Sequence, residues 1–190
     1  MARYDDLVAL VAIHVSPCPE PAIISALQQT TRDFCKETRV WVHDVPETAV
    51  IPEQLSYALD VPEQTTVVHV WGIDGRTGRY ELQPEHYITF PNTLNFNKLP
   101  ARDTFKPVVS LMPSAGSEEI PDLLVEYFQD YIVSGAVAHL QMQPFRDWSQ
   151  PNAAEAHLFK YQQGLQEAIS MRDNGLNMSK IKGRVRPQYI

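Results

Sequence analysis

Cysteine and glycine are scarce in this chain of 190 residues, which has 2 cysteines and 8 glycines against 15 prolines. Cys18 and Cys35 stand far apart, with no CxxC pair and no matched Cys/His spacing. These features argue against a disulfide framework and a zinc knuckle, and a reducing compartment fits best. The excess of proline over glycine predicts many fixed turns.

Long apolar runs are also missing. The run LVALVAIHV, from Leu7 to Val15, is far shorter than the roughly 20 residues that cross a bilayer. It follows Asp5 and Asp6 instead of the basic flank of a signal peptide, and it lacks a small-residue cleavage site. We therefore expect no membrane association, and we expect a short helix here with both aspartates at its positive end.

Motifs for chemistry are lacking as well. The sequence has no GxSxG, GxxxxGK[ST] or GxGxxG pattern, and no two of its 6 histidines have the i, i+4 spacing of a helical metal site. Glu118 with Glu119, or Glu53 with Glu63, could be imagined as a glycosidase pair, but sequence does not fix their separation. Solvated loop acids are the simpler interpretation. We predict no catalytic, cofactor-binding or metal-binding residue, no cofactor and no enzymatic activity.

Charge is divided unevenly along the chain. The stretch 171–190 holds five lysines and arginines against Asp173 alone, so its net charge is +4 and that of the preceding residues is −11. An acidic body repels phosphate, whereas a cationic segment attracts an acidic partner. A solvated chain end is the alternative to a binding segment, but the apolar residues between the cations favour docking onto protein.

Helical periodicity marks both ends of the chain. Ile23, Leu27, Thr30, Phe34 and Thr38 form one stripe after the prolines at 17, 19 and 21. A second stripe after Pro121 consists of Leu124, Phe128, Tyr131, Gly135, Ala138 and Met142. A third, after Pro151 and with Ser149 or Asn152 as cap, consists of Ala154, Leu158, Tyr161, Leu165 and Ala168, and Gly175 follows its end. We expect Phe34, Phe128, Tyr131, Leu158 and Leu165 to be largely buried.

The middle of the chain shows short β-type runs without helix-length segments between them. They are bounded by proline, glycine or asparagine and span 39–45, 55–59, 65–73, 79–82, 86–90, 93–97 and 107–112. Asp74-Gly75 and Gly78 predict a hairpin loop, and Pro91 predicts a second tight turn. The pattern predicts an antiparallel sheet or sandwich.

The segment Pro144 to Trp148 forms a corner between two helical patterns. We expect it to reverse the chain so that two long helices lie against each other, with Phe145 and Trp148 closing the end of their shared core. The small residues Ser134, Gly135, Ala136 and Ala138, with Gly164 opposite, would let the two helices approach closely.

Together these patterns predict an α+β fold. A helical core of about four helices, two N-terminal and two long C-terminal, is formed by residues 1–38 and 118–175. An antiparallel β-domain is inserted at 39–113, and an extended C-terminal arm occupies 176–190.

The order of these elements resembles the head-to-tail adaptor (head completion) proteins of tailed bacteriophages, especially short-tailed ones. The resemblance covers Cys18 to Asp173 and is carried by SALQQTTRDFCKETRVW (25–41), VVSLMPS (108–114), SGAVAHL (134–140) and the pattern from Pro144 to Ala168. It implies a ring of copies, commonly dodecameric, that sits under the portal in the virion after assembly in the host cytoplasm. Such a ring extends the DNA channel without binding DNA specifically, and it provides the platform for tail and nozzle proteins.

The resemblance also implies that the C-terminal arm reaches the portal. The residues that correspond to the contacts of this arm are Leu176, Lys180, Ile181, Lys182, Arg184, Val185, Arg186 and Tyr189.

Two alternatives remain open. One is a virion-associated hydrolase that degrades peptidoglycan with carboxylates of the β-region. The other is a tail-tube or tail-completion protein, a class dominated by β-structure, for which helix content should fall well below a third.

Overall fold

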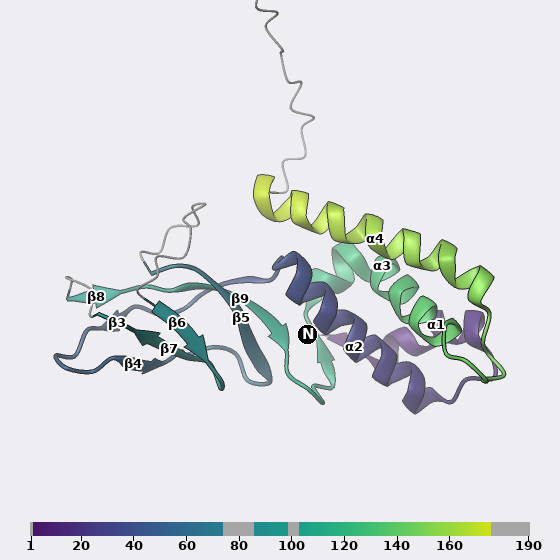
Figure 1. Ribbon diagram of the computed structural model, residues 1–190, viewed down its shortest axis with the longest axis horizontal. Helices are drawn as coiled ribbons and strands as arrows, with labels where there is room; N and C mark the ends of the chain where they lie inside the picture. The colour runs from purple at the N-terminus through teal and green to yellow at the C-terminus, as the bar shows by residue number, and fades with distance from the viewer. Residues whose placement is uncertain (1, 74–85, 99–102, 176–190) are drawn as a thin grey trace, which may run out of the picture.

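The computed structural model describes residues 2–73, 86–98 and 103–175 (Figure 1). Four helices are present in these residues: α1 (Asp5–Val15), α2 (Glu20–Thr38), α3 (Asp122–Gln141) and α4 (Pro151–Asn174). The segment between α2 and α3 consists of short strands, and every strand pairing is antiparallel. The predicted α+β fold with about four helices is thus confirmed.

The strands form four small sheets. Two have three strands, in the orders β2-β9-β5 and β4-β7-β6, and two are the pairs β3-β8 and β1-β10. Their bounds are β1 Ala2–Arg3, β2 Val42–Asp44, β3 Thr48–Ala49, β4 Ser56–Ala58, β5 Thr65–Gly72, β6 His86–Thr89, β7 Thr93–Phe96, β8 Thr104–Phe105, β9 Val108–Pro113 and β10 Glu119–Ile120. The run 79–82 and the hairpin loop at Asp74-Gly75 lie outside the described residues.

The second predicted turn is present between β6 and β7. Thr89 pairs with Thr93, so Phe90, Pro91 and Asn92 form the connection. The Asn92 side chain accepts a hydrogen bond from Val67 N and donates one to Thr65 O. This turn is therefore fastened to the start of β5.

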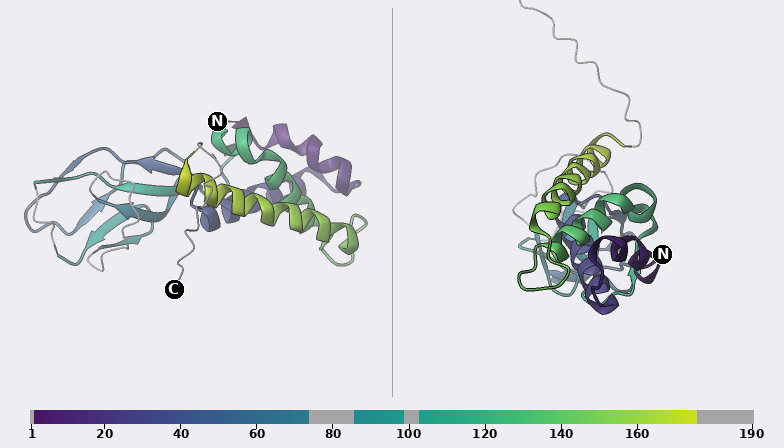
Figure 2. Two further views of the ribbon diagram at one scale, coloured as in Figure 1. Left: turned by 90° about the horizontal axis from the view of Figure 1, so that it is seen from above. Right: turned by 90° about the vertical axis from the view of Figure 1, so that its right-hand side faces the viewer.

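Buried apolar side chains fall into two clusters. One is built from all four helices and the short pair β1-β10, and the other from residues between Val45 and Leu111. Figures 1 and 2 show the helical part and the β part end to end along the longest axis of the molecule. Each part has its own core because each buries its own apolar faces.

Helix α2 buries the stripe that the sequence predicts. Ile23, Leu27, Thr30, Phe34 and Thr38 are all buried. Helix α3 differs from an amphipathic helix, because every residue from 132 to 138 is buried. Helices α1, α2 and α4 all pack against α3, which explains burial around its circumference.

Helices α3 and α4 cross through two reciprocal contacts. A Cβ atom on Gly135 would lie 2.6 Å from the Tyr161 ring, and a Cβ on Gly164 would lie 2.4 Å from Cβ of Tyr131. On each helix, a glycine therefore packs against a tyrosine of the other helix. The predicted role of these glycines in helix packing has a direct geometric basis here.

Burial along α4 is shallower than we expected. Phe34 and Phe128 are buried, but Tyr131, Leu158 and Leu165 are only partly buried. Met142 is 44% exposed because it follows the last residue of α3 as its C-cap. Helix α4 covers one side of the bundle, so only its innermost positions, Ala154, Gly164 and Ala168, are buried.

The cap of α4 also differs from the prediction. Gln150 is the N-cap and makes no side-chain cap hydrogen bond, while the Ser149 hydroxyl donates to Gln141 O. The helix ends at Asn174, and Gly175 follows it with a φ of 70°, a left-handed value that favours glycine.

No single helix in the described residues is long and apolar enough to cross a membrane. Helices α1 and α2 meet that test only as a pair, and they are bent by 108° at the break between them.

Candidate assembly surfaces and the junction pocket

The two predicted corner residues behave differently. Trp148 is partly buried and packs against the helical core, with the Arg146 guanidinium 5.7 Å from its ring centroid. Phe145 is fully exposed and has a φ of 58°, so its side chain closes no part of the core. The prediction for Phe145 is wrong because the left-handed backbone at this position directs the side chain into solvent.

The corner does reverse the chain as predicted. Gln150 N donates to Gln141 O, which joins the two ends of the connection between α3 and α4. The Gln141 side chain donates to His14 O at 3.0 Å and fastens the end of α1 to the same corner. Three helix ends are thereby held together at one end of the helical part.

The predicted arm residues, from Leu176 to Tyr189, lie outside the described residues. Their point of departure is described, because α4 ends next to the β part. Arg172, in the last turn of α4, donates to Thr38 O at the end of α2 at 2.7 Å. Its guanidinium also lies 5.2 Å from the ring centroid of Trp71 on β5. Helix α4 is therefore attached to both parts of the molecule at its C-terminal end.

A hydrogen-bonded chain continues from Trp71 across the junction. Trp71 Nε1 donates to the Ser110 hydroxyl at 2.6 Å, and Ser110 donates to Arg39 O at 2.9 Å. His69 lies edge-on against Trp71, with ring centroids 4.7 Å apart. Burial, followed by the cations of Arg39 and Arg172, lowers the pKa of His69 from 6.5 to about 4.

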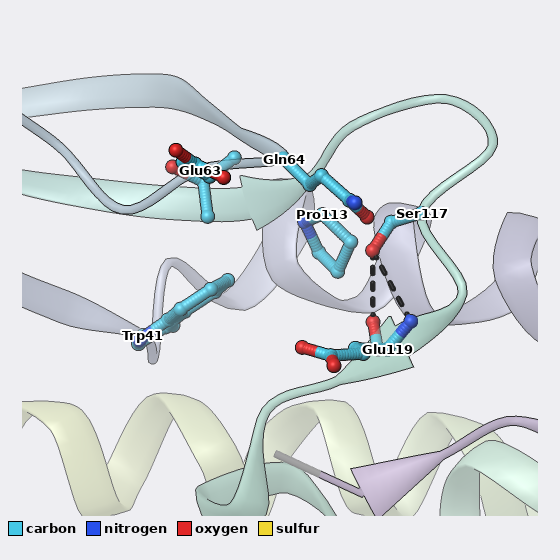
Figure 3. A pocket seen from close by; sticks show the side chains of 7 residues that line it. Trp41, Glu63, Gln64, Pro113, Ser117 and Glu119 are labelled. Atoms are coloured by element: carbon cyan, nitrogen blue, oxygen red, sulfur yellow. Dashed lines mark hydrogen bonds between the residues drawn. The ribbon is translucent and has the colours of Figure 1, made fainter.

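A small cavity lies at the same junction (Figure 3). Its volume is about 190 Å³, and it is lined by Trp41, Glu63, Gln64, Thr65, Pro113, Ser117 and Glu119. Small-molecule sites commonly measure about 300–1,000 Å³, so this pocket is too small for a substrate of that size. It has room for one side chain.

Hydrogen bonds hold the walls of this pocket. The Ser117 hydroxyl donates to Glu119 O and accepts from Glu119 N, as the dashed lines in Figure 3 mark. Gln28 of α2 donates to Ser117 O, and Ser114 N donates to Gln64 O. The pocket is therefore fixed by both the helical part and the β part.

The carboxylates of this pocket do not form a glycosidase site. Glu63 and Glu119 are both exposed, whereas a general acid of that class requires an apolar environment that keeps its carboxyl protonated. The pairs considered from sequence, Glu118 with Glu119 and Glu53 with Glu63, do not meet in it, since only one member of each lines the pocket.

Two histidines are closer than the sequence suggested. The rings of His14 on α1 and His157 on α4 have centroids 5.0 Å apart, and burial, then His14 and Lys160, lowers the pKa of His157. Within the described ranges no group of three or more His, Cys, Asp and Glu side chains is placed to hold a metal ion. Both cysteines are free, and burial raises the pKa of Cys35 to about 12.

Large apolar side chains are exposed on both parts of the molecule. The helical part exposes Leu10, Ile13, Tyr127, Met142, Phe145 and Phe159, and the β part exposes Val42, Ile51, Leu55, Tyr87 and Phe90. Exposed apolar groups that lie near one another mark surfaces for protein contacts.

Sequence reasoning missed the Arg172–Trp71 contact and the junction pocket. The sequence indicates only that Arg172 belongs to the basic C-terminal stretch and that Trp71 belongs to a strand. Nothing in the sequence indicates that a tryptophan within a β-type run contacts an arginine at the end of a distant helix. Comparison with known proteins finds no family model that matches this chain and no curated protein that matches it significantly.

Proposed function

We propose that this chain is a structural subunit of a bacteriophage virion, a head-to-tail adaptor. Copies form a ring under the portal by heterologous contacts, in which one face of each subunit meets a different face of its neighbour. The ring extends the DNA channel and provides the platform on which tail and nozzle proteins assemble.

The observation that carries this proposal is the position of exposed apolar side chains on an elongated molecule. Ile13 and Phe145 lie on the last turn of α1 and in the α3–α4 corner, at the free end of the helical part. Ile51 and Leu55 lie in the loop between β3 and β4, at the free end of the β part (Figure 1). A subunit that joins a head to a tail needs separate contact surfaces of this kind.

Two further features support the proposal over its alternatives. The four helices make up more than a third of the chain, which is unlike the β-dominated tail-tube class. Both carboxylates that line the junction pocket are exposed, whereas a peptidoglycan hydrolase of the carboxylate type requires a general acid in an apolar environment.

The test is attachment to the cognate portal, with full-length protein and a variant that ends at Gly175. Both buried clusters are built from described residues, and we expect the truncated chain to keep this fold. We expect full-length protein to sediment with the portal as a ring and the truncated form to detach at low and at moderate salt. Equal attachment of both forms would show that the arm does not bind the portal. Turnover of peptidoglycan by the protein would favour the hydrolase.

A further inference from the structure

The junction pocket has the chemistry of a receptor for one cationic side chain. Trp41 presents an aromatic ring, and Glu63 and Glu119 bring two carboxylates from different segments (Figure 3). Tryptophan is the best aromatic partner for a cation, and a carboxylate pairs with an ammonium or a guanidinium.

This receptor is not occupied by a cation from the described part of the same chain. Neither Glu63 nor Glu119 forms an ion pair with any described residue. Arg3 lies opposite Glu119 in the β1-β10 pair, but its guanidinium lies 3.1 Å from Asp5 and 3.6 Å from Glu118. The two pocket carboxylates are therefore available to an outside group.

We infer that the junction pocket receives one lysine or arginine side chain from the C-terminal segment, residues 176–190, of a neighbouring copy. The inference rests on the proposed ring. In this arrangement the same C-terminal segment makes two contacts, one with the portal and one with a neighbouring subunit.

Charge complementarity supports this occupant. The segment 176–190 carries Lys180, Lys182, Arg184 and Arg186 and no acid, so its charge is +4 and that of residues 1–175 is −11. No other stretch of the chain is so cationic. A pocket with two carboxylates and no ion pair to a described cation attracts such a segment.

Position supports it as well. Arg172 fastens the end of α4 to Thr38 O, three residues before the pocket residue Trp41, so the segment begins at the same junction as the pocket. Rotation about a ring axis keeps every point at its height along that axis. The segment of a neighbour therefore leaves at nearly the height of this pocket, and its 15 residues span up to roughly 50 Å when extended.

The experiment uses full-length protein with a photo-crosslinking residue in place of Gln64, at the pocket wall. Rings are assembled, on the portal where a template is required, from equal amounts of ¹⁴N and ¹⁵N chains. We expect crosslinks between the pocket of one chain and residues 176–190 of another, detectable as peptides of mixed isotope. Crosslinks that join only peptides of one isotope, or that never include 176–190, would overturn the inference.

A charge variant gives a second measurement. Glu63→Gln combined with Glu119→Gln removes both carboxylates at nearly constant volume, and Glu155→Gln with Glu126→Gln is the matched control on exposed helix positions. We expect the pocket variant to assemble roughly two- to fivefold more weakly, the effect of losing one solvent-exposed charge pair, and the control to assemble normally. Normal rings from the pocket variant would overturn the pocket contact alone. Failure of the unmodified chain to form any ring would overturn the proposed function as well.

Discussion

At the scale of single residues, His69 makes the free energy of unfolding depend on pH. The imidazole lies edge-on against Trp71, and burial, followed by the cations of Arg39 and Arg172, lowers its pKa to about 4. In the unfolded chain it takes up a proton near its ordinary pKa of about 6.5. Between these values the unfolded state binds more protons, so the free energy of unfolding falls as pH drops from about 6.5 to about 4.

We expect His69→Gln to reduce this acid sensitivity, measured by urea unfolding at several pH values between 4 and 7. Above the unfolded pKa the imidazole is neutral in both states and contributes no pH dependence. In NMR titrations, Arg172→Gln should raise the pKa of His69 because one nearby cation is removed, while Lys160→Gln should leave it unchanged. An unaltered pKa in Arg172→Gln would show that the Arg172–Trp71 contact is not formed in solution.

The buried residues of the α2 stripe could be predicted from the sequence, whereas the depth of burial along α4 and the contacts of the junction could not. Every member of the α2 stripe is buried because the 3.6-residue period fixes which side chains share a face. Arg172 and Thr38 are separated by 134 positions, and only tertiary packing brings them together. Phe145 shows the opposite failure, because composition predicted an aromatic plug where the backbone φ directs the ring outward.

At the scale of elements, the crossing of α3 and α4 depends on two glycines. In an exposed helix, replacing glycine by alanine stabilises by about 1 kcal/mol. At Gly164 the new methyl group would meet Cβ and Cγ of Tyr131 at 2.4 and 2.3 Å, and Cβ is held in place by the backbone of α3. We expect Gly164→Ala to lower the unfolding free energy by about 1–3 kcal/mol, because overpacking outweighs the gain in helix propensity.

Urea unfolding measures this effect, with Gln163→Ala as the control on the exposed side of the same turn. The control should stay within about 0.5 kcal/mol of the unmodified protein. A stabilised Gly164→Ala variant would mean that the two helices lie farther apart than described here.

The corner between these helices offers a second comparison. Trp148→Ala removes a side chain that packs on the helical core, and we expect it to lower stability by about 1–3 kcal/mol and to reduce the yield of folded protein. Phe145→Ala should change stability by less than about 0.5 kcal/mol, since that ring is fully exposed. Trp148→Phe should be well tolerated, because the buried indole N–H has no hydrogen-bond partner among the described residues. Equal losses from the alanine variants at 145 and 148 would contradict this assignment of roles.

Elements with strong local signals were predictable, and elements defined by pairing alone were not. Prolines at the starts of α2 and α4 and the glycine after α4 set these helix bounds almost to the residue. Strands β3, β8, β1 and β10 have two residues each and exist only because a distant partner lies beside them. No periodicity can be read from two residues, so the sequence did not predict them.

At the scale of the whole molecule, charge separates the body of the chain from its end. Residues 1–175 carry a net charge of −11, and the four cations of 176–190 reduce this to −7. In the proposed ring, an acidic body would let DNA pass without adhering, because its net negative charge repels phosphate. The same charge would attract the cationic segment of another copy in the proposed ring.

We expect full-length protein to bind duplex DNA weakly at about 150 mM salt, with a dissociation constant no tighter than the ~10⁻⁴–10⁻⁶ M of ordinary non-specific binding. At about 50 mM salt any binding should depend on residues 176–190, and the variant ending at Gly175 should bind less. Fluorescence anisotropy with a labelled duplex at several salt concentrations measures both. Tight binding by the full-length chain, with a steep fall in affinity as salt rises, would mean that the segment contacts phosphate. Its lysines and arginines would then be recognising DNA, and the acidic pocket of a neighbouring copy would lose its occupant.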